Sequence, residues 1–340
     1  MQALSQFQTD LTQGSVFGQL LKFSVPFLLS NLLQALYNMA DMVIVGQFGG
    51  AVGASAVGIG GQVTILIINL ISGLAVGGTI MIAQFIGARR QQEVERTVGT
   101  MFTLYAIAGA AITVIMLLIN PWVLRLMQTP ADCYGEALAY LNICMGGTLF
   151  IVGYNAVSAV LRGMGDSRHP LIFVGVAAVV NIVLDLVFVG VFRMGAAGAA
   201  WATIAAQALS LTLSIVFLRR RDFVFDFHPR SFKMDKALAG QLVKLGIPAS
   251  LQGTLVSLSF MVLMTVANGV AGLTGSAALS IAGKVNSVAI LPSLAMQASV
   301  SSMAGQNIGA GKPERARKTM FVAMGMSFVF SALMFAVVNL

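Results

Sequence analysis

Two carboxylates stand inside long apolar stretches of the chain. Asp185 lies in the run VVNIVLDLVFVGVF (residues 179–192), which contains no Lys or Arg, and Asp41 lies in LYNMADMV (residues 36–43). A charged side chain at the centre of a bilayer costs roughly 2.5–3.5 kcal/mol on an insertion scale, so acids at such positions usually have a functional role. The alternative is structural: each Asp would bond a neighbouring helix and stiffen the bundle.

Oxygen-bearing side chains accompany both acids. Tyr37 precedes Asp41 by one helical turn, and Asn181 precedes Asp185 by one turn, so each pair shares a helix face. Thr203 occurs in the next apolar stretch, among small residues that let backbones approach closely. Carboxylate, amide and hydroxyl oxygens suit a proton or a hard cation, and not zinc or copper. These residues predict a site that exchanges H⁺ or Na⁺ as the protein changes conformation.

The elements that must position these residues are membrane helices. Of the 340 residues, 57% are hydrophobic and only 9% are charged, and the mean hydropathy is +0.88. Soluble domains carry about 25% charged residues. The first eighteen residues lack the features of a cleavable signal peptide, so we expect the first apolar segment to be retained as a helix. The sequence predicts an all-α polytopic membrane protein with about nine transmembrane helices, over residues 18–45, 52–86, 93–119, 135–161, 169–191, 196–218, 239–267, 275–308 and 314–339.

The basic residues predict the orientation. About 17 of the 20 Lys and Arg residues fall in alternate connections or at the helix ends beside them. The positive-inside rule places those connections and the N-terminus in the cytoplasm, with the chain in the cytoplasmic (inner) membrane. The net charge of +8 therefore reflects the basic residues of the cytoplasmic connections, and we expect no nucleic-acid partner.

An internal repeat divides the chain. An offset of 222 residues pairs Lys22 with Lys244, Pro26 with Pro248, and AQFIGA (83–88) with GQNIGA (305–310). Both copies begin on the same side, so the repeats are parallel and related by an axis along the membrane normal. We expect an N-terminal lobe of six helices, a cytoplasmic linker, and a C-terminal lobe of which about three helices are present, with these bounds: 1–218, 219–238 and 239–340.

The chain resembles the MATE (multidrug and toxic compound extrusion) transporters, most closely their DinF-like branch. The resemblance rests on LLKFSVPFLLSNLLQALYNMADMVIVGQFGG (20–50), LRGMGDSRHP (161–170) and NIVLDLVFVGVFRMGAAGAAWAT (181–203). It implies two six-helix lobes that face each other in a V around a drug cavity, of which the last three helices are absent from this chain. It also implies a coupling-ion site in the N-terminal lobe, where H⁺ or Na⁺ would bind Asp41, Asn181, Asp185, Thr203 and the carbonyl of Ala199, within a network completed by Tyr37 and Asn155.

The function that this resemblance implies is ion-coupled export of small organic compounds, often cationic. Such a protein is a transporter and not an enzyme, works as a monomer in the lipid bilayer, and uses no nucleotide or other cofactor. MATE members of the other bacterial branch carry an acid in the seventh helix. The corresponding stretch here, IPASLQGTLVSLSFMVLMTV (247–266), contains no acid, which favours ion coupling in the N-terminal lobe.

Two alternatives stay open. A lipid-linked oligosaccharide flippase shares the architecture, but an anionic headgroup should demand several basic residues in the cavity, and Lys284 is the one candidate. Lys284 could instead bond a carbonyl or extend to the membrane surface. A membrane scaffold or an inactive fragment is the other alternative, and it predicts that neither Asp matters to any flux.

Overall fold

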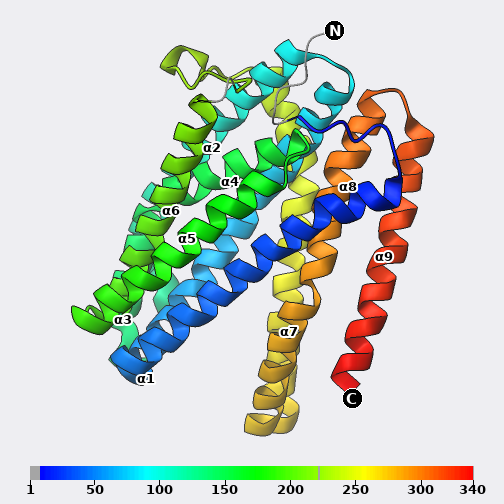
Figure 1. The fold of residues 1–340 in the computed structure, drawn as a ribbon. Coiled ribbons are helices and arrows are strands. Elements are labelled where there is room, and N and C mark those ends of the chain that lie inside the picture. The colour runs from blue at the N-terminus through cyan, green and yellow to red at the C-terminus, as the bar shows by residue number, and fades with distance from the viewer. Residues whose placement is uncertain (1–7, 221–222, 340) are drawn as a thin grey trace.

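The computed structural model describes residues 8–220 and 223–339, but only some of the side chains of α7 from residue 260 onward, and not those of residues 229 and 337–339. Every regular element in these residues is helical, which confirms the all-α prediction (Figure 1). The helices are α1 (Val16–Gly87), α2 (Gln91–Leu126), α3 (Ala131–Gly146), α4 (Thr148–Gly163), α5 (Arg168–Asp185), the π-helix η1 (Leu186–Val191), α6 (Gly195–Arg219), the short 3₁₀ turn η2 (Pro229–Ser231), α7 (Lys236–Ala289), α8 (Leu291–Gly309) and α9 (Pro313–Asn339).

α1 is long enough for two membrane spans. Its 72 residues would extend about 108 Å if straight, against about 30 Å of hydrocarbon. Gly50 lies between the two spans and leaves helical geometry at φ 68°, a conformation that glycine adopts without steric penalty. α7 and α8 together are the repeat counterpart of α1, because α8 ends at Gly309 where α1 ends at Gly87. Among the described residues, α1, α2, α5–η1, α6 and α9 are long and apolar enough to cross a membrane, and the bent α3–α4 pair makes a sixth such element. Counting α1 as two spans and α7–α8 as its repeat counterpart would give the nine predicted segments.

Two helix breaks differ from the predicted segments. The sequence predicts a connection at 268–274, but α7 continues to Ala289 and the break falls at Ile290. Pro292 explains the new position, since proline is tolerated in the first turn of a helix and has no N–H to continue the backbone hydrogen bonds of α7. The predicted single segment 135–161 is bent by 48° between α3 and α4. At that bend Gly147 packs so closely on Ile204 of α6 that a Cβ would collide with it.

The helices form two groups, α1–α6 and α7–α9, that meet at one end and diverge toward the other (Figure 1). The end where they meet carries residues 8–15, the α1–α2 turn and the linker between α6 and α7, and we name it the basic end.

The repeated motif is the contact between the lobes at the basic end. A Cβ on Gly87 would collide with the carbonyl oxygen of Gln306, and a Cβ on Gly309 would collide with that of Gln84. Gln84 and Gln306 are repeat equivalents, as are Gly87 and Gly309, so each motif packs on the other. Glycine at these positions lets the two backbones cross in direct contact.

The second half of α1 also crosses α7. A Cβ on Gly77 would lie 2.6 Å from the Leu242 carbonyl oxygen, and one on Gly246 would lie 2.8 Å from that of Gly73. The Ser250 hydroxyl donates to the Leu70 carbonyl oxygen at 2.8 Å across the same crossing. α1 is therefore shared between the lobes.

The linker packs on the N-terminal lobe. The ring of Phe102 in α2 lies 5.5 Å from the ring of Phe225 and 6.2 Å from that of Phe232. The backbone N–H of Asp235 donates to the Thr100 hydroxyl at 3.2 Å, and Arg96 pairs with the Asp235 carboxylate at 3.4 Å. The segment that leads into α7 is thus held by α2.

Substitution of a crossing glycine should destabilise the fold. We expect Gly309→Ala to lower the thermal unfolding midpoint of the detergent-solubilised protein, because the added methyl group overpacks a backbone contact at about 1–3 kcal/mol. Scanning fluorimetry measures this. Gly325→Ala in α9 is the matched control, since no atom lies within 4 Å of its new methyl group and alanine is the better helix former. Equal midpoints for the two variants would contradict the crossing as described.

Candidate ion-coupling site

Asp41 and Asp185 lie side by side inside the N-terminal lobe. Asp41 comes from the first span of α1 and is 7% exposed, while Asp185 ends α5 and is fully buried. Their carboxyl groups lie close enough to interact with each other, and Thr203 of α6 lies close enough to interact with Asp41. Three helices therefore bring two acids and a hydroxyl to one place.

Several buried side-chain oxygen and nitrogen atoms around the two acids lack a hydrogen-bond partner. Both carboxylate oxygens of Asp185, one of Asp41, and both amide atoms of Asn181 are buried and unpaired among the described residues. Such groups are costly to bury unless something binds them. Two carboxylates in contact also repel each other when both are ionised, and a shared proton or a bound cation removes that repulsion.

The donor set fits H⁺ or Na⁺ better than a transition metal. Its members are carboxylate, amide and hydroxyl groups, which are hard ligands. No group of three or more His, Cys, Asp or Glu side chains that could hold a metal ion occurs in the described part of the chain.

A π-helix begins directly after Asp185. In η1 the helix takes the wider i→i+5 pattern, and at its end the Phe192 N–H donates to the Val187 carbonyl oxygen at 2.9 Å. Short π-helical turns are rare and often occur at functional sites. α6 packs tightly on this turn, because a Cβ on Gly198 would lie 3.1 Å from the Phe188 carbonyl carbon. The last turn of α5 thus changes geometry at the acid itself.

The other predicted residues are placed as follows. Ala199 precedes Thr203 by one turn of α6, is 1% exposed, and packs in a cluster with Val189 of η1. The Tyr37 side chain lies near Asp41 and near Gln207. The Asn155 amide donates to the Ile151 carbonyl oxygen at 2.8 Å, and its side chain lines a narrow cavity. No contact between Asn155 and either carboxylate is found in the described residues, so its part in the network stays a prediction.

Two further polar side chains belong to the surroundings of the acids, Gln207 beside Tyr37 and Tyr140 beside the carboxylates, and the sequence analysis did not select them. Gln207 follows Thr203 by one turn on α6, and this spacing was an available signal for it. Tyr140 of α3 is 8% exposed and lies close enough to Asp41 and Asp185 to be influenced by both charges. Nothing in the spacing of Tyr140 indicates this, because its position depends on how α3 packs.

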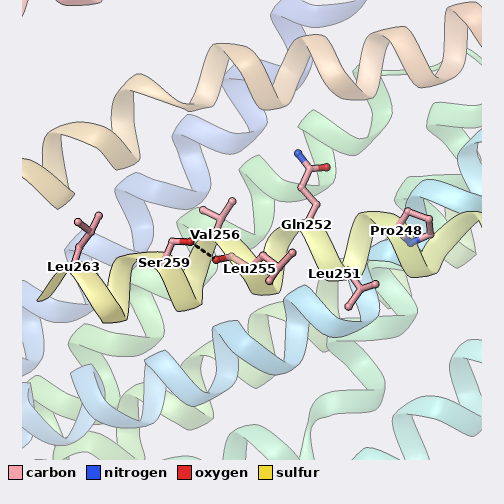
Figure 2. A pocket seen from close by; sticks show the side chains of 7 residues that line it. All are labelled: Pro248, Leu251, Gln252, Leu255, Val256, Ser259 and Leu263. Atoms are coloured by element: carbon pink, nitrogen blue, oxygen red, sulfur yellow. Dashed lines mark hydrogen bonds between the residues drawn. The ribbon is translucent and has the colours of Figure 1, made fainter. Parts of the chain in front are cut away.

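A cavity of about 540 Å³ lies along α7 (Figure 2). Figure 2 shows its lining residues following one another along this helix. The Ser259 hydroxyl already donates to the Leu255 carbonyl oxygen at 2.8 Å, so Gln252 is the side chain in the lining with free polar capacity. The side chain of Lys284 lies outside the described residues. The lining, which contains no charged side chain, consists of Pro248, Leu251, Gln252, Leu255, Val256, Ser259 and Leu263.

Comparison with known proteins identifies relatives across nearly the whole chain. The sequence profile of the MatE family matches residues 26–187 and 248–340. The probable multidrug resistance protein YpnP of Bacillus subtilis (strain 168) is 33% identical over 90% of this chain and 68% of its own length. The probable multidrug resistance protein YoeA of the same strain is 31% identical over 95% of this chain and 71% of its own length.

Solved structures agree with the sequence relatives. An outward-facing multidrug resistance MATE family transporter of the MOP superfamily superposes with a TM-score of 0.91 at 27% identity, over 97% of this chain and 74% of that chain. A MOP superfamily transporter from Pyrococcus furiosus superposes with a TM-score of 0.89 at 28% identity, over 95% of this chain and 72% of that chain. The profile match, the two Bacillus relatives and the shared two-lobe fold together show that this chain belongs to the MATE family of multidrug efflux transporters.

Proposed function

We propose that the chain exports organic, often cationic compounds in exchange for H⁺ or Na⁺, and that Asp41 and Asp185 bind the coupling ion. The observation that carries this proposal is the pair of adjacent buried carboxylates with unpaired oxygens. Asn181, Thr203 and the Ala199 carbonyl would add ligand oxygens, and Tyr37 with Gln207 would orient Asp41.

Ion binding at this pair would bias the packing of three helices. Without a proton or cation the two carboxylates repel, which favours separation of α1 from α5. With the ion bound, α1, α5 and α6 can pack closely around it. A ligand shifts a conformational equilibrium only through different affinities for the two states, and this pair provides such a difference.

The cavity along α7 supports an organic substrate with substantial apolar surface. Five of its seven lining side chains are Pro, Leu or Val, and none is charged. An anionic lipid headgroup would need basic side chains there, and the described lining contains none, which supports the proposal of drug export.

The membrane placement belongs to the same proposal. We assign the basic end, with the N-terminal segment and the linker, to the cytoplasm of the inner membrane on the strength of the basic residues in those connections. Since both lobes come from one chain, a monomer would suffice for transport.

Asp185→Asn should abolish coupled transport. We expect gradient-driven flux of a fluorescent organic cation in proteoliposomes to fall at least about tenfold, because an amide can neither take up a proton nor offer a negative charge to Na⁺. The flux is measured under an imposed pH gradient and, separately, under an imposed Na⁺ gradient. Asp226→Asn in the linker is the control, because this carboxylate is 55% exposed and should leave flux unchanged.

Either of two results would contradict this reading. Full flux in Asp185→Asn would remove that acid from the coupling site. No gradient-driven flux in a folded wild-type chain, for any organic cation tested, would favour the scaffold or fragment alternative.

Ion binding should also be detectable without transport. A ligand that binds only the folded state stabilises it by RT ln(1 + [L]/Kd), about 2.7 kcal/mol at a hundredfold excess over Kd. If Na⁺ is the coupling ion, added NaCl should raise the thermal midpoint of wild type above that of Asp41→Asn, with KCl as the salt control. If H⁺ is the ion, the thermal midpoint of wild type should rise relative to that of Asp41→Asn as the pH falls, because protonation removes a repulsion that the Asn variant does not have, and Na⁺ should leave the difference unchanged. A midpoint difference that neither ion alters would count against ion binding at Asp41.

A further inference from the structure

Residues 8–15 cross the basic end between the lobes, and we name this segment the clasp (Figure 1). Its centre is hydrogen-bonded to the C-terminal lobe and packs against it. The Leu11 N–H donates to the Gln306 side-chain oxygen at 2.9 Å, and the Asn307 amide donates to the Leu11 carbonyl oxygen at 3.3 Å. The Leu11 side chain is 3% exposed and packs in a cluster with Met303 and Met326.

Two cations at the start of α9 hold the second half of the clasp. Lys312 donates to the Thr12 carbonyl oxygen at 3.0 Å. The Arg315 guanidinium donates to the carbonyl oxygens of Gln13 and Gly14, both at 2.8 Å. Hydrogen bonds from charged donors are stronger than neutral ones, so this half of the clasp is firmly attached to the C-terminal lobe.

The turn inside the clasp is fixed by Asp10. Its carboxylate accepts from the Thr12 N–H at 2.8 Å and from the Thr12 hydroxyl at 2.7 Å. Partial burial raises the pKa of Asp10, but the Thr12 bonds and the Lys312 and Arg89 charges outweigh it and hold that pKa below its ordinary value. The turn is therefore formed with an ionised carboxylate at neutral pH.

The attachment to the N-terminal lobe is much thinner. The Thr9 N–H donates to the Met164 carbonyl oxygen at 3.1 Å, and the Gln8 amide reaches Gln91 at 3.5 Å. Next to Met164, Gly165 has φ +87°, and a Cβ there would lie 2.8 Å from the Thr9 carbonyl oxygen.

The clasp also continues directly into α1 at Val16, and the Gln19 amide of α1 donates to the Asp10 carbonyl oxygen at 3.4 Å. This first turn of α1 itself packs on the C-terminal lobe, since Val16 and Leu20 share the cluster of Met303 and Met326. Apart from α1, the clasp bonds the N-terminal lobe mainly through one backbone donor.

The clasp lies over the contact between the lobes. Close to it, the Ser302 hydroxyl of α8 donates to the Arg162 carbonyl oxygen of α4 at 2.5 Å, and Ser302 is fully buried. A cavity of about 910 Å³, lined by clasp residues together with Arg89 and Gln306, adjoins the segment. Release of the clasp would therefore expose the lobe contact to solvent.

We propose that residues 8–15 act as a clasp that holds the basic end closed, that stays with the C-terminal lobe, and that releases at the Thr9–Met164 contact when this end opens. The inference rests on the proposed transport cycle, in which the basic end must open. The difference between these attachments assigns the release point. With the first turn of α1 held on the C-terminal lobe, the Thr9–Met164 hydrogen bond separates more readily than a buried leucine with five hydrogen bonds.

Two reporter cysteines test this in a background without Cys133 and Cys144, both replaced by Ala. Ser302→Cys reports opening of the lobe contact, and Leu11→Cys reports departure of the clasp from the C-terminal lobe. The measurement is the labelling rate with a membrane-impermeant maleimide in detergent, without gradient or substrate. Thr9→Pro removes the N–H donor to Met164, and Thr9→Ala is the matched control that keeps it.

We expect Thr9→Pro to speed labelling of Ser302→Cys about two- to tenfold over Thr9→Ala, as loss of one hydrogen bond predicts, with Leu11→Cys unchanged. Arg315→Ala should speed labelling of both reporters relative to Arg317→Ala, whose guanidinium stacks 5.8 Å from the Phe321 ring centroid.

Equal Ser302→Cys rates in Thr9→Pro and Thr9→Ala would overturn the proposal. Faster labelling of Leu11→Cys in Thr9→Pro would overturn the assignment of the clasp to the C-terminal lobe. Should Thr9→Pro fail to fold by size-exclusion chromatography, equal Ser302→Cys rates in Arg315→Ala and Arg317→Ala would overturn it as well. Because labelling needs no transport, faster labelling in a chain without flux would refute the proposed function and leave the clasp standing.

Discussion

The direct backbone contact between α1 and the C-terminal lobe determines how the rest of the molecule is arranged. Two helices can approach this closely only where side chains are absent, and glycines supply that at Gly73, Gly87 and Gly309. Because Gly87 and Gly309 are repeat equivalents, the same close backbone approach occurs twice, at positions related by the repeat axis. In this structure the lobes are therefore in contact at the basic end and diverge beyond it, which leaves one face of α7 available to line a cavity.

α1 joins the two functional regions of the molecule. Its first span carries Asp41, and its second span carries the glycines that contact α7 and α8. Gly50, with its left-handed backbone, separates these spans. Any change in how α1 packs against α5 therefore acts on a helix whose continuation is held by the other lobe. Closely packed helices tend to shift between discrete arrangements and not to deform continuously, so such a shift would be passed on as a relative movement of the lobes.

The sequence predicted the features that the membrane restricts, such as buried charges. It did not predict the features that depend on which helix faces pack together. Charged groups are rare in apolar runs, so Asp41 and Asp185 could be selected from composition alone. Their adjacency could not, because no local pattern says which faces of α1 and α5 meet, and the expectation came from a family resemblance. The spacing of Gln207 from Thr203 could have predicted its position, whereas the position of Tyr140 depends on the packing of α3. The repeat predicted parallel halves, but not that the repeated motifs themselves form the contact between them.

The clasp and the linker are attached in a reciprocal manner. The segment before α1 is held by α8 and α9, while the segment before α7 is held by α2, and α2 and α9 begin at repeat-equivalent positions. This arrangement has a consequence for synthesis. Leu11 and its partner Gln306 are 295 residues apart, so at 5–20 residues per second the ribosome needs about 15–60 s to supply that partner. The linker, by contrast, follows α2 and can dock as soon as it emerges. The clasp therefore closes only after α8 and the start of α9 have been made.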